Sequence, residues 1–355
     1  MTHDCPLQGN PPSDSGDGRG KLASMPQISV VLPVYNGAAT IVRATRSILE
    51  QSFDDLELIV VDDGSTDETL ERLRSVRDPR LRVLDLPHRG VVVAANRGTE
   101  VATAPIIARM DADDVSHVRR LETQLHCLRS TGVDVVGCAV RVLDKSGRRV
   151  ETMRRYEKWI NEETASEEDI IALRFIELPL VNPTILARRR YFDLGFRDGD
   201  FPEDYDLMLR AVEAEMRFAK VKEMLFDWSD HQHRLTRSDA RYSHTAFDRC
   251  RRAHLLRGPL RGSQCVDVWG VGNTGKPWLV WLKENAITVR HGYELNERKI
   301  GETIHGVRVR RTRDLKPPDG TPILVTVGAE GARAIIRPQL ESKGYRVGGD
   351  AWFVA

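Results

Sequence analysis

A short acidic stretch, Asp111-Ala112-Asp113-Asp114, offers the clearest chemistry in the sequence. It follows an apolar run at residues 105–108 that is typical of a buried strand. Carboxylates this close together repel one another and raise each other's pKa unless a cation lies between them. Mg²⁺ and Mn²⁺ prefer oxygen ligands and are commonly shared with a phosphate group. The stretch therefore predicts a site for Mn²⁺ or Mg²⁺, although Asp residues also form turns and cap helices.

Two further acidic pairs could take part in chemistry. Asp62 and Asp63 end another apolar run, residues 56–61, and a glycine follows them. Glu203 and Asp204 stand where a helix is predicted to begin. A carboxylate can take the proton of a hydroxyl group. However, Asp before Gly also forms turns, and acidic residues at a helix start interact favourably with the helix dipole. Both interpretations stay open for each pair.

The elements that must position these residues follow from hydrophobic periodicity. Apolar runs predict strands at 27–35, 56–61, 81–86 and 105–110. Amphipathic patterns between them predict helices at 40–51, 65–76 and 91–102, and Ser65 with Glu68 has capping-box spacing. This alternation predicts a mostly parallel sheet, whose ligands bind beyond the carboxyl ends of its strands. The side chains expected at that edge are Tyr35, Asp62, Asp63, Asp111 and Asp113.

The pattern is less regular after residue 133. It predicts a strand at 133–143, a polar surface loop at 151–169, a helix at about 168–177, a strand at 182–186, and one helix over 239–257. The segment His231–Arg237 follows a strand and could close over a diphosphate, because arginine offers a planar set of donors. Its His-x-His spacing also occurs in zinc sites, but the sequence shows no third ligand.

A glycine motif marks the C-terminal part of the chain. Gly270, Gly272 and Gly275 have Gly-x-Gly-x-x-Gly spacing between a predicted strand, 266–269, and a predicted helix, 278–285. Glu294 lies about twenty residues beyond, where a ribose-binding acid is expected in dinucleotide folds. These four residues are a candidate second nucleotide site in a small Rossmann-like module. Alternatively, the glycines serve only the tight turn, and the module docks partners or the catalytic domain.

Length and composition set the domain organisation. The 355 residues are enough for two domains. We expect a disordered leader at 1–25, rich in Gly, Pro, Ser and Asp, then an α/β domain at 26–257, a linker at 258–263 and the Rossmann-like domain at 264–355.

Charge, cysteine content and hydropathy exclude several classes of function. The net charge of +1 argues against binding nucleic acid through bulk electrostatics. The five cysteines are scattered and form no Cys-x-x-Cys pair, which fits a reducing compartment. The sequence contains no run of 18 or more apolar residues, so it predicts no membrane span. We therefore expect a cytoplasmic protein with at most peripheral association with the inner face of a membrane.

Several motifs, in this order and spacing, resemble those of the family 2 glycosyltransferases, which have the GT-A fold. The matching segments are 31–36 (Val-Leu-Pro-Val-Tyr-Asn), 60–67 (Val-Val-Asp-Asp-Gly-Ser-Thr-Asp), 95–98, 108–114, 120–124 and 203–207. The resemblance covers about residues 26–257 and implies a nucleotide-sugar-binding mixed sheet flanked by helices. One departure is the loss of the proline usual after the acidic loop, where the chain reads Ser116-His117-Val118-Arg119. This makes the loop less rigid but removes no ligand.

The resemblance implies roles for residues that match the motifs of the donor site. Pro33 and Tyr35 would line the pocket of the base and ribose. Asp62, with Asp63, would hydrogen-bond the base, which is typically uracil.

It also implies roles around the diphosphate. Asp111 would contact the ribose or a metal-bound water, and Asp113 would ligate the metal that bridges the diphosphate. Asp204 matches the general base. A His or Arg near the phosphates is common in the family, and His233 and Arg234 are the candidates.

These observations predict an inverting, metal-dependent glycosyltransferase. It would move a sugar from a nucleotide-sugar, with a UDP-sugar as the expected donor, to a hydroxyl group of a saccharide or glycolipid acceptor in surface polysaccharide or glycan synthesis. One alternative is an NAD(P)-binding oxidoreductase based on residues 264–355. Another is a scaffold that binds a sugar nucleotide without catalysis, which the joint presence of Asp111, Asp113 and Asp204 argues against.

Overall fold

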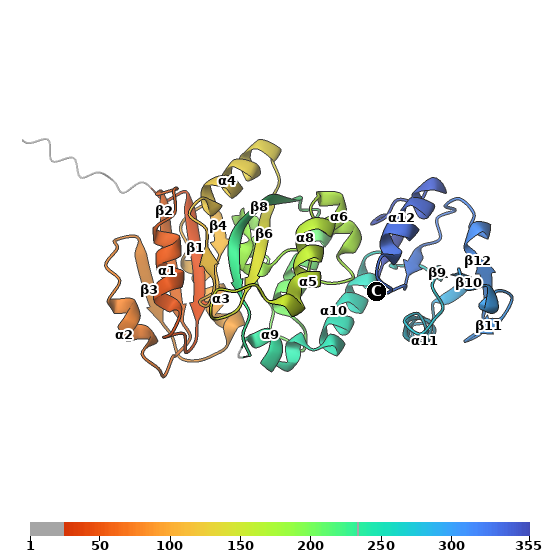
Figure 1. The fold of residues 1–355 in the computed structure, drawn as a ribbon, viewed down its shortest axis with the longest axis horizontal. Coiled ribbons are helices and arrows are strands. Elements are labelled where there is room, and N and C mark those ends of the chain that lie inside the picture. Colours follow the sequence, from red (N-terminus) through yellow and green to blue (C-terminus); the bar gives the residue numbers. More distant parts are fainter. Residues whose placement is uncertain (1–24, 233) are drawn as a thin grey trace, which may run out of the picture.

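The described chain contains two β-sheets with flanking helices, which lie side by side (Figure 1). The computed structural model describes residues 25–232 and 234–355. The predicted leader at 1–25, apart from its last residue, and His233 therefore lie outside the described residues. The first sheet has eight strands in the order β3-β2-β1-β4-β7-β6-β8-β5, and the second has six in the order β11-β12-β10-β9-β13-β14.

The strands of the first sheet are β1 (Ile28–Val34), β2 (Leu56–Asp62), β3 (Leu81–Asp85), β4 (Ile106–Arg109), β5 (Val115–Ser116), β6 (Val135–Leu143), β7 (Leu186–Arg188) and β8 (Phe218–Ser229). Those of the second sheet are β9 (Cys265–Trp269), β10 (Thr288–Glu294), β11 (Thr303–Ile304), β12 (Val307–Arg311), β13 (Ile323–Val325) and β14 (Ala351–Phe353).

The helices are α1 (Ile41–Leu49), α2 (Thr69–Arg74), α3 (Val91–Val101), α4 (Arg120–Thr131), α5 (Arg154–Lys158), α6 (Glu167–Leu173), α7 (Arg189–Phe192), α8 (Glu203–Glu213), α9 (Leu235–Ser238), α10 (His244–Arg257), α11 (Lys276–Glu284) and α12 (Ala332–Ser342). Among the described residues, none of these helices is both long enough and apolar enough to cross a membrane.

Burial on both faces explains the first sheet. Every residue of β1 is buried, as expected for parallel strands covered by helices on two sides. Successive side chains point to opposite faces. Val31 therefore packs in the cluster that includes residues of α3, whereas Val30 packs in the one that includes residues of α1. Strands β1 to β4 pair in parallel, so their carboxyl ends share one edge, as predicted.

Several predicted elements were wrong in their limits or type. The capping box of Ser65 and Glu68 does not form: α2 begins at Thr69, and the Ser65 hydroxyl donates to Asp62 instead. The predicted strand at 182–186 begins with a 3-10 turn, because Pro183 favours the start of a helical turn, and β7 follows it.

Two further predictions failed after residue 133. The predicted surface loop at 151–169 contains short helical turns that bury Trp159 and Ile160. These apolar residues are spaced among charged ones, which hid the pattern. The single helix predicted over 239–257 is split, because Ser243 caps a new helix, α10, after a turn at Ala240–Tyr242.

An ion-pair network fixes α8 against α10. Ligand-type atoms of Asp206, Cys250 and His254 all lie within 4.8 Å of one another. However, Arg210 donates to Asp206 over 2.7 Å, and an Arg257 nitrogen lies 2.9 Å from His254 Nε2. Cationic groups thus already contact the would-be ligands, which favours a structural network over a metal site.

The second sheet has the arrangement predicted for a Rossmann-like unit. Strands β12, β10, β9, β13 and β14 are all parallel to their neighbours, and α11 follows the glycine loop after β9. Contacts join the two halves: the Arg251 guanidinium of α10 donates to the Val354 carbonyl over 3.3 Å, and Arg337 of α12 pairs with Asp169 of α6 over 2.5 Å. The predicted domain limits at 257 and 264 stay a prediction.

The glycine loop allows a direct test of this packing. A Cβ at Gly275 would lie 1.9 Å from the Gly270 carbonyl oxygen, whereas one at Gly272 would meet only the flexible Lys299 amine at 3.2 Å. We expect Gly275→Ala to destabilise the protein by about 2 kcal/mol, because the backbone must move apart. Gly272→Ala should stay close to wild type. Chemical denaturation of both variants measures the difference, and equal stability would contradict the described loop.

Candidate active site

Loops at the ends of β1 and β2 are tied to each other. Asn36 adopts a positive φ of 51°, and its side chain accepts a hydrogen bond of 2.8 Å from the Thr66 backbone. In return, the Ser65 hydroxyl accepts one from the Asn36 backbone over 2.8 Å, and Asp67 accepts one from Ala38 over 3.1 Å. The polar residues after β2 thus hold the turn that presents Tyr35.

The two carboxylates at the end of β2 are buried and already hydrogen-bonded. Asp62 accepts hydrogen bonds from the backbone and the hydroxyl of Ser65. Asp63 accepts from the backbones of Arg89 and Gly90 over 2.9 and 2.8 Å. These contacts support the turn-forming interpretation of both residues. Their predicted contact with a base stays a prediction.

An aromatic face lies beside this edge. Tyr35 is 47% exposed, and its ring stacks on the His88 imidazole with 4.1 Å between centroids. His88, in the loop after β3, is held by Asp63, whose carboxylate oxygen lies 2.9 Å from Nδ1. Pro33 is buried within β1. The exposed surface available for stacking consists of Tyr35, which the sequence indicated, and His88, which it did not.

The acidic loop follows β4 and has a distinct partner for each carboxylate. Asp111 pairs with the buried Arg109 over 3.0 Å, and Asp113 lies 2.8 Å from His231 Nε2. Asp114 is buried and accepts a hydrogen bond of 2.8 Å from the backbone of Ser229 at the end of β8. The loop is thereby fixed between the ends of two strands.

Burial and mutual repulsion shape the charge of this loop. Burial, opposed by Arg109 and reinforced by Asp113, raises the pKa of Asp111. Burial, reinforced by Asp113 and Asp111, raises the pKa of Asp114 well above its usual range. A cation bound here would relieve this repulsion.

The side chains at the acidic loop are of the types that bind a divalent metal ion. Asp111 and Asp113 offer carboxylate oxygens, and His231 offers a ring nitrogen in contact with Asp113. The other ring nitrogen of His231, Nδ1, is buried and has no partner among the described residues. Mn²⁺ and Mg²⁺ both accept such oxygen-rich donor sets, and an imidazole favours Mn²⁺ over Mg²⁺.

Asp204 lies at the start of α8 within electrostatic range of the acidic loop. Burial, reinforced by the charges of Glu203 and Asp111, raises the pKa of Asp204 to about 8. Glu203 is buried, and its two carboxylate oxygens share the hydrogen bond that the Tyr242 hydroxyl donates, at 2.7 and 2.8 Å. Glu203 is therefore occupied structurally, whereas Asp204 bonds only to the backbone of Tyr205 among the described residues.

Arg234 interacts electrostatically with the acidic loop, and its predicted place near phosphates stays a prediction. Its guanidinium stacks over the Trp228 ring at 4.1 Å, and its charge lowers the pKa values of Asp111 and Asp114 against the larger effect of burial. The predicted neighbour His233 lies outside the described residues. His231 is the histidine that contacts Asp113. Both histidines follow the same predicted strand, so the sequence did not indicate which of them does so.

The structure thus gathers most predicted site residues at one edge of the first sheet. Tyr35, the Asp62–Asp63 pair, Asp111, Asp113 and Arg234 follow the ends of β1, β2, β4 and β8, and Asp204 interacts with Asp111. Gly270, Gly272, Gly275 and Glu294 belong to the second sheet instead. There the Glu294 carboxylate accepts from its own turn and lies 3.4 Å from the Lys299 amine.

Comparison with known proteins adds the family. Residues 29–196 match the model for glycosyl transferase family 2. These residues form a family 2 glycosyltransferase domain. The chain is 30% identical over 231 residues to the bifunctional glycosyltransferase pgtA of Dictyostelium discoideum, covering 53% of this chain and 30% of that protein. It is 29% identical over 248 residues to the putative glycosyltransferase EpsE of Bacillus subtilis, covering 66% of this chain and 85% of that protein.

The family 2 domain also resembles solved structures. TarS of S. aureus in complex with UDP-GlcNAc superposes with a TM-score of 0.52 at 21% identity, covering 65% of this chain and 66% of that one. TarS in complex with UDP gives a TM-score of 0.51 at 20% identity, with 65% of each chain covered. These likenesses confirm the GT-A fold. The chain spans 30% to 42% of the length of the first curated relatives it matches.

The contact between His231 and Asp113 can be tested in this family 2 domain. We expect His231→Gln to weaken Mn²⁺ affinity about 10- to 100-fold, because a group in contact with the carboxylate is lost. The exposed His126 of α4 provides the matched control, His126→Gln, which should bind Mn²⁺ as wild type. Electron paramagnetic resonance of free Mn²⁺ measures both affinities. Unchanged affinity in His231→Gln would remove His231 from the metal site.

Proposed function

We propose that the chain is an inverting, metal-dependent glycosyltransferase. The observation that carries this proposal is the acidic loop at one edge of the sheet, whose Asp111 interacts electrostatically with the buried Asp204. Asp204 has a pKa raised to about 8 and interacts with Asp111 of the loop that precedes Asp113. A proton acceptor beside a diphosphate-binding loop is the arrangement that sugar transfer from a nucleotide donor requires.

The donor we propose is a UDP-sugar. The exposed Tyr35 ring, backed by His88, offers a stacking surface for a base at the ends of β1 and β3. Asp62 or Asp63 would then hydrogen-bond the base from behind this surface. The binding of UDP and UDP-GlcNAc by TarS, which has the same fold, supports this choice of donor.

The diphosphate would lie against the acidic loop. Asp111, Asp113 and His231 would hold Mn²⁺ or Mg²⁺, which would neutralise charge on the departing diphosphate. Arg234 would add a fork of donors to the same phosphates. Asp111 is kept in place by Arg109, and Asp114 by the backbone of β8.

Asp204 would take the proton of the acceptor hydroxyl. The oxygen then attacks the anomeric carbon as the bond to the diphosphate breaks, so a single displacement inverts that centre. We propose a saccharide or glycolipid acceptor, as in surface polysaccharide synthesis. The protein would meet a glycolipid at the inner face of a membrane. We therefore propose a cytoplasmic location with at most peripheral association with that membrane.

A second candidate function, nucleotide binding by the second sheet, is favoured by Gly272. The packing requires glycine at 270 and 275, where an added Cβ would approach other atoms to 2.4 and 1.9 Å. At Gly272 it would approach only the Lys299 amine and the Glu294 carboxylate. A glycine that packing does not need is expected where a phosphate approaches the backbone. An NAD(P)-dependent activity would depend on this site.

Asp204→Asn tests the proposed reaction. We expect UDP release from UDP-sugars to fall about 10²- to 10⁴-fold while UDP affinity stays the same, because only the base is lost. Wild-type activity should rise with pH through about 8, since Asp204 must be ionised to act. The exposed Asp200, changed to Asn, is the matched control and should behave as wild type. Enzyme-coupled detection of UDP measures turnover, and full activity in Asp204→Asn would exclude Asp204 as the base.

The same variant has an independent effect on stability. The folded-state pKa of Asp204 lies above its unfolded value, so the folded protein holds an extra proton between about pH 4 and pH 8. Folding stability is therefore lost as the pH rises through this window. The melting temperature of Asp204→Asn minus that of the wild type should be higher at pH 9 than at pH 5. A pH-independent difference would contradict the burial of Asp204.

A further inference from the structure

A cavity of about 230 Å³ lies where helices of the first sheet meet the second sheet. Its walls come from the end of α6, the second half of α8, the end of α10, and β14. Pockets for drug-sized ligands usually have about 300–1,000 Å³. This cavity therefore has room for a small molecule only.

Arg174 contributes a buried positive charge to this cavity. The residue is 7% exposed, and its guanidinium donates to the backbone carbonyl of Ile171 and lies 4.5 Å from the Phe175 ring centre. Burial lowers the pKa of Arg174 to about 10. Among the described residues, no carboxylate forms an ion pair with it. Because buried charges are normally paired, Arg174 lacks an expected partner.

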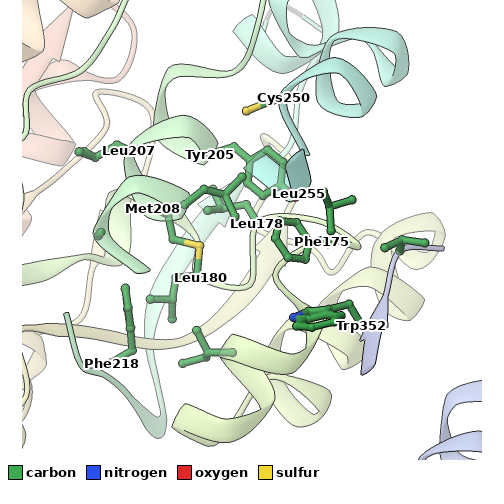
Figure 2. Close-up of a cluster of buried hydrophobic side chains, with 14 of the residues drawn as sticks. Phe175, Leu178, Leu180, Tyr205, Leu207, Met208, Phe218, Cys250, Leu255 and Trp352 are labelled. Atoms are coloured by element: carbon green, nitrogen blue, oxygen red, sulfur yellow. The ribbon is translucent and has the colours of Figure 1, made fainter. Parts of the chain in front are cut away.

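Trp352 of β14 contributes its indole ring to the wall of the same cavity. It is 6% exposed, and its Nε1 has no hydrogen-bond partner among the described residues. Figure 2 shows its ring near Phe175 at the margin of the buried hydrophobic cluster. Leu209, Val212 and Pro259 complete an apolar wall. The cavity thus combines a cation with aromatic and apolar surface.

Glu213 also lines the cavity but is compensated. Its carboxylate lies 2.5 Å from His254 Nδ1 and 4.0 Å from the Arg257 guanidinium. These neighbours on α10 offset its negative charge. The charge of Glu213 also acts on Arg174, but no ion pair between the two forms among the described residues, so Arg174 keeps a positive charge without a direct partner.

We propose that this cavity binds a small organic anion, with its carboxylate or phosphate on Arg174 and its apolar body against Phe175, Leu209 and Trp352. An anion supplies the partner that Arg174 lacks, and the apolar body displaces water from the aromatic wall. The site is separate from the acidic loop and does not depend on the proposed transfer reaction. It shares α8 with Asp204, because Leu209 and Val212 lie in the second half of that helix.

Calorimetric titration of the full chain with benzoate, phenyl phosphate and the neutral benzamide tests this proposal. We expect saturable binding of benzoate or phenyl phosphate in the millimolar range, and at least tenfold weaker binding of benzamide. The stronger of the two anions identifies the head group. Equal binding of benzamide, or no saturable binding of either anion, would overturn the proposal.

Variants locate the binding. Arg174→Met should weaken binding of the anion at least tenfold, and the exposed Arg261 provides the control Arg261→Met, which should bind as wild type. Since Arg174→Met could impair folding, Val212→Phe reduces the cavity volume while keeping the cation, and it should also weaken binding at least tenfold. Unchanged affinity in a folded Arg174→Met or Val212→Phe protein would overturn the proposal.

Discussion

The electrostatic repulsion among Asp111, Asp113 and Asp114 is the constraint on which the candidate site depends. Three carboxylates at the end of one strand are tolerated because each has a different compensation. Arg109 pairs with Asp111, His231 contacts Asp113, and the Ser229 backbone donates to the buried Asp114. Two of these partners come from the end of β8, more than a hundred residues away in sequence. The acidic loop thus joins the end of β8 to the end of β4 near the centre of the sheet. A bound cation would offset the remaining negative charge of the carboxylates.

Buried arginines fix the elements that carry the acidic loop and Asp204. Arg120, fully buried in α4, donates to the carbonyls of Arg109 and Pro183, which fixes the end of β4. Helix α8, which presents Asp204, is fixed in turn by the contacts of Arg210 with Asp206 and with the Leu194 carbonyl. In both cases a buried arginine satisfies carbonyl groups that would otherwise lack donors. Such groups tie loops far apart in sequence to a rigid sheet, which is what precise positioning of reacting groups requires.

Local patterns predicted residues 26–110 and the second sheet well, and residues 133–257 poorly. Strands β1, β2 and β4 consist of uninterrupted apolar runs, and each is followed directly by its polar residues, so both the sheet edge and the acidic loop could be predicted. The Ser65 capping box failed because Asp62 competes for the same hydroxyl, a contact that depends on the turn after β2. His231 could not be separated from His233 by spacing, since its contact with Asp113 spans 118 residues. Likewise, Trp159 is buried by tertiary packing that its charged neighbours in sequence conceal.

The central claim is that the acidic loop binds a nucleotide diphosphate through a metal ion. Calorimetric titration of UDP into the wild-type protein, first with Mn²⁺ and then with EDTA, tests it most directly, with GDP and NAD as comparison ligands. We predict binding of UDP with Mn²⁺ that is lost in EDTA, and weaker binding of GDP. Binding of NAD without any binding of UDP, unaffected by EDTA, would contradict the account and would move the functional centre to the second sheet.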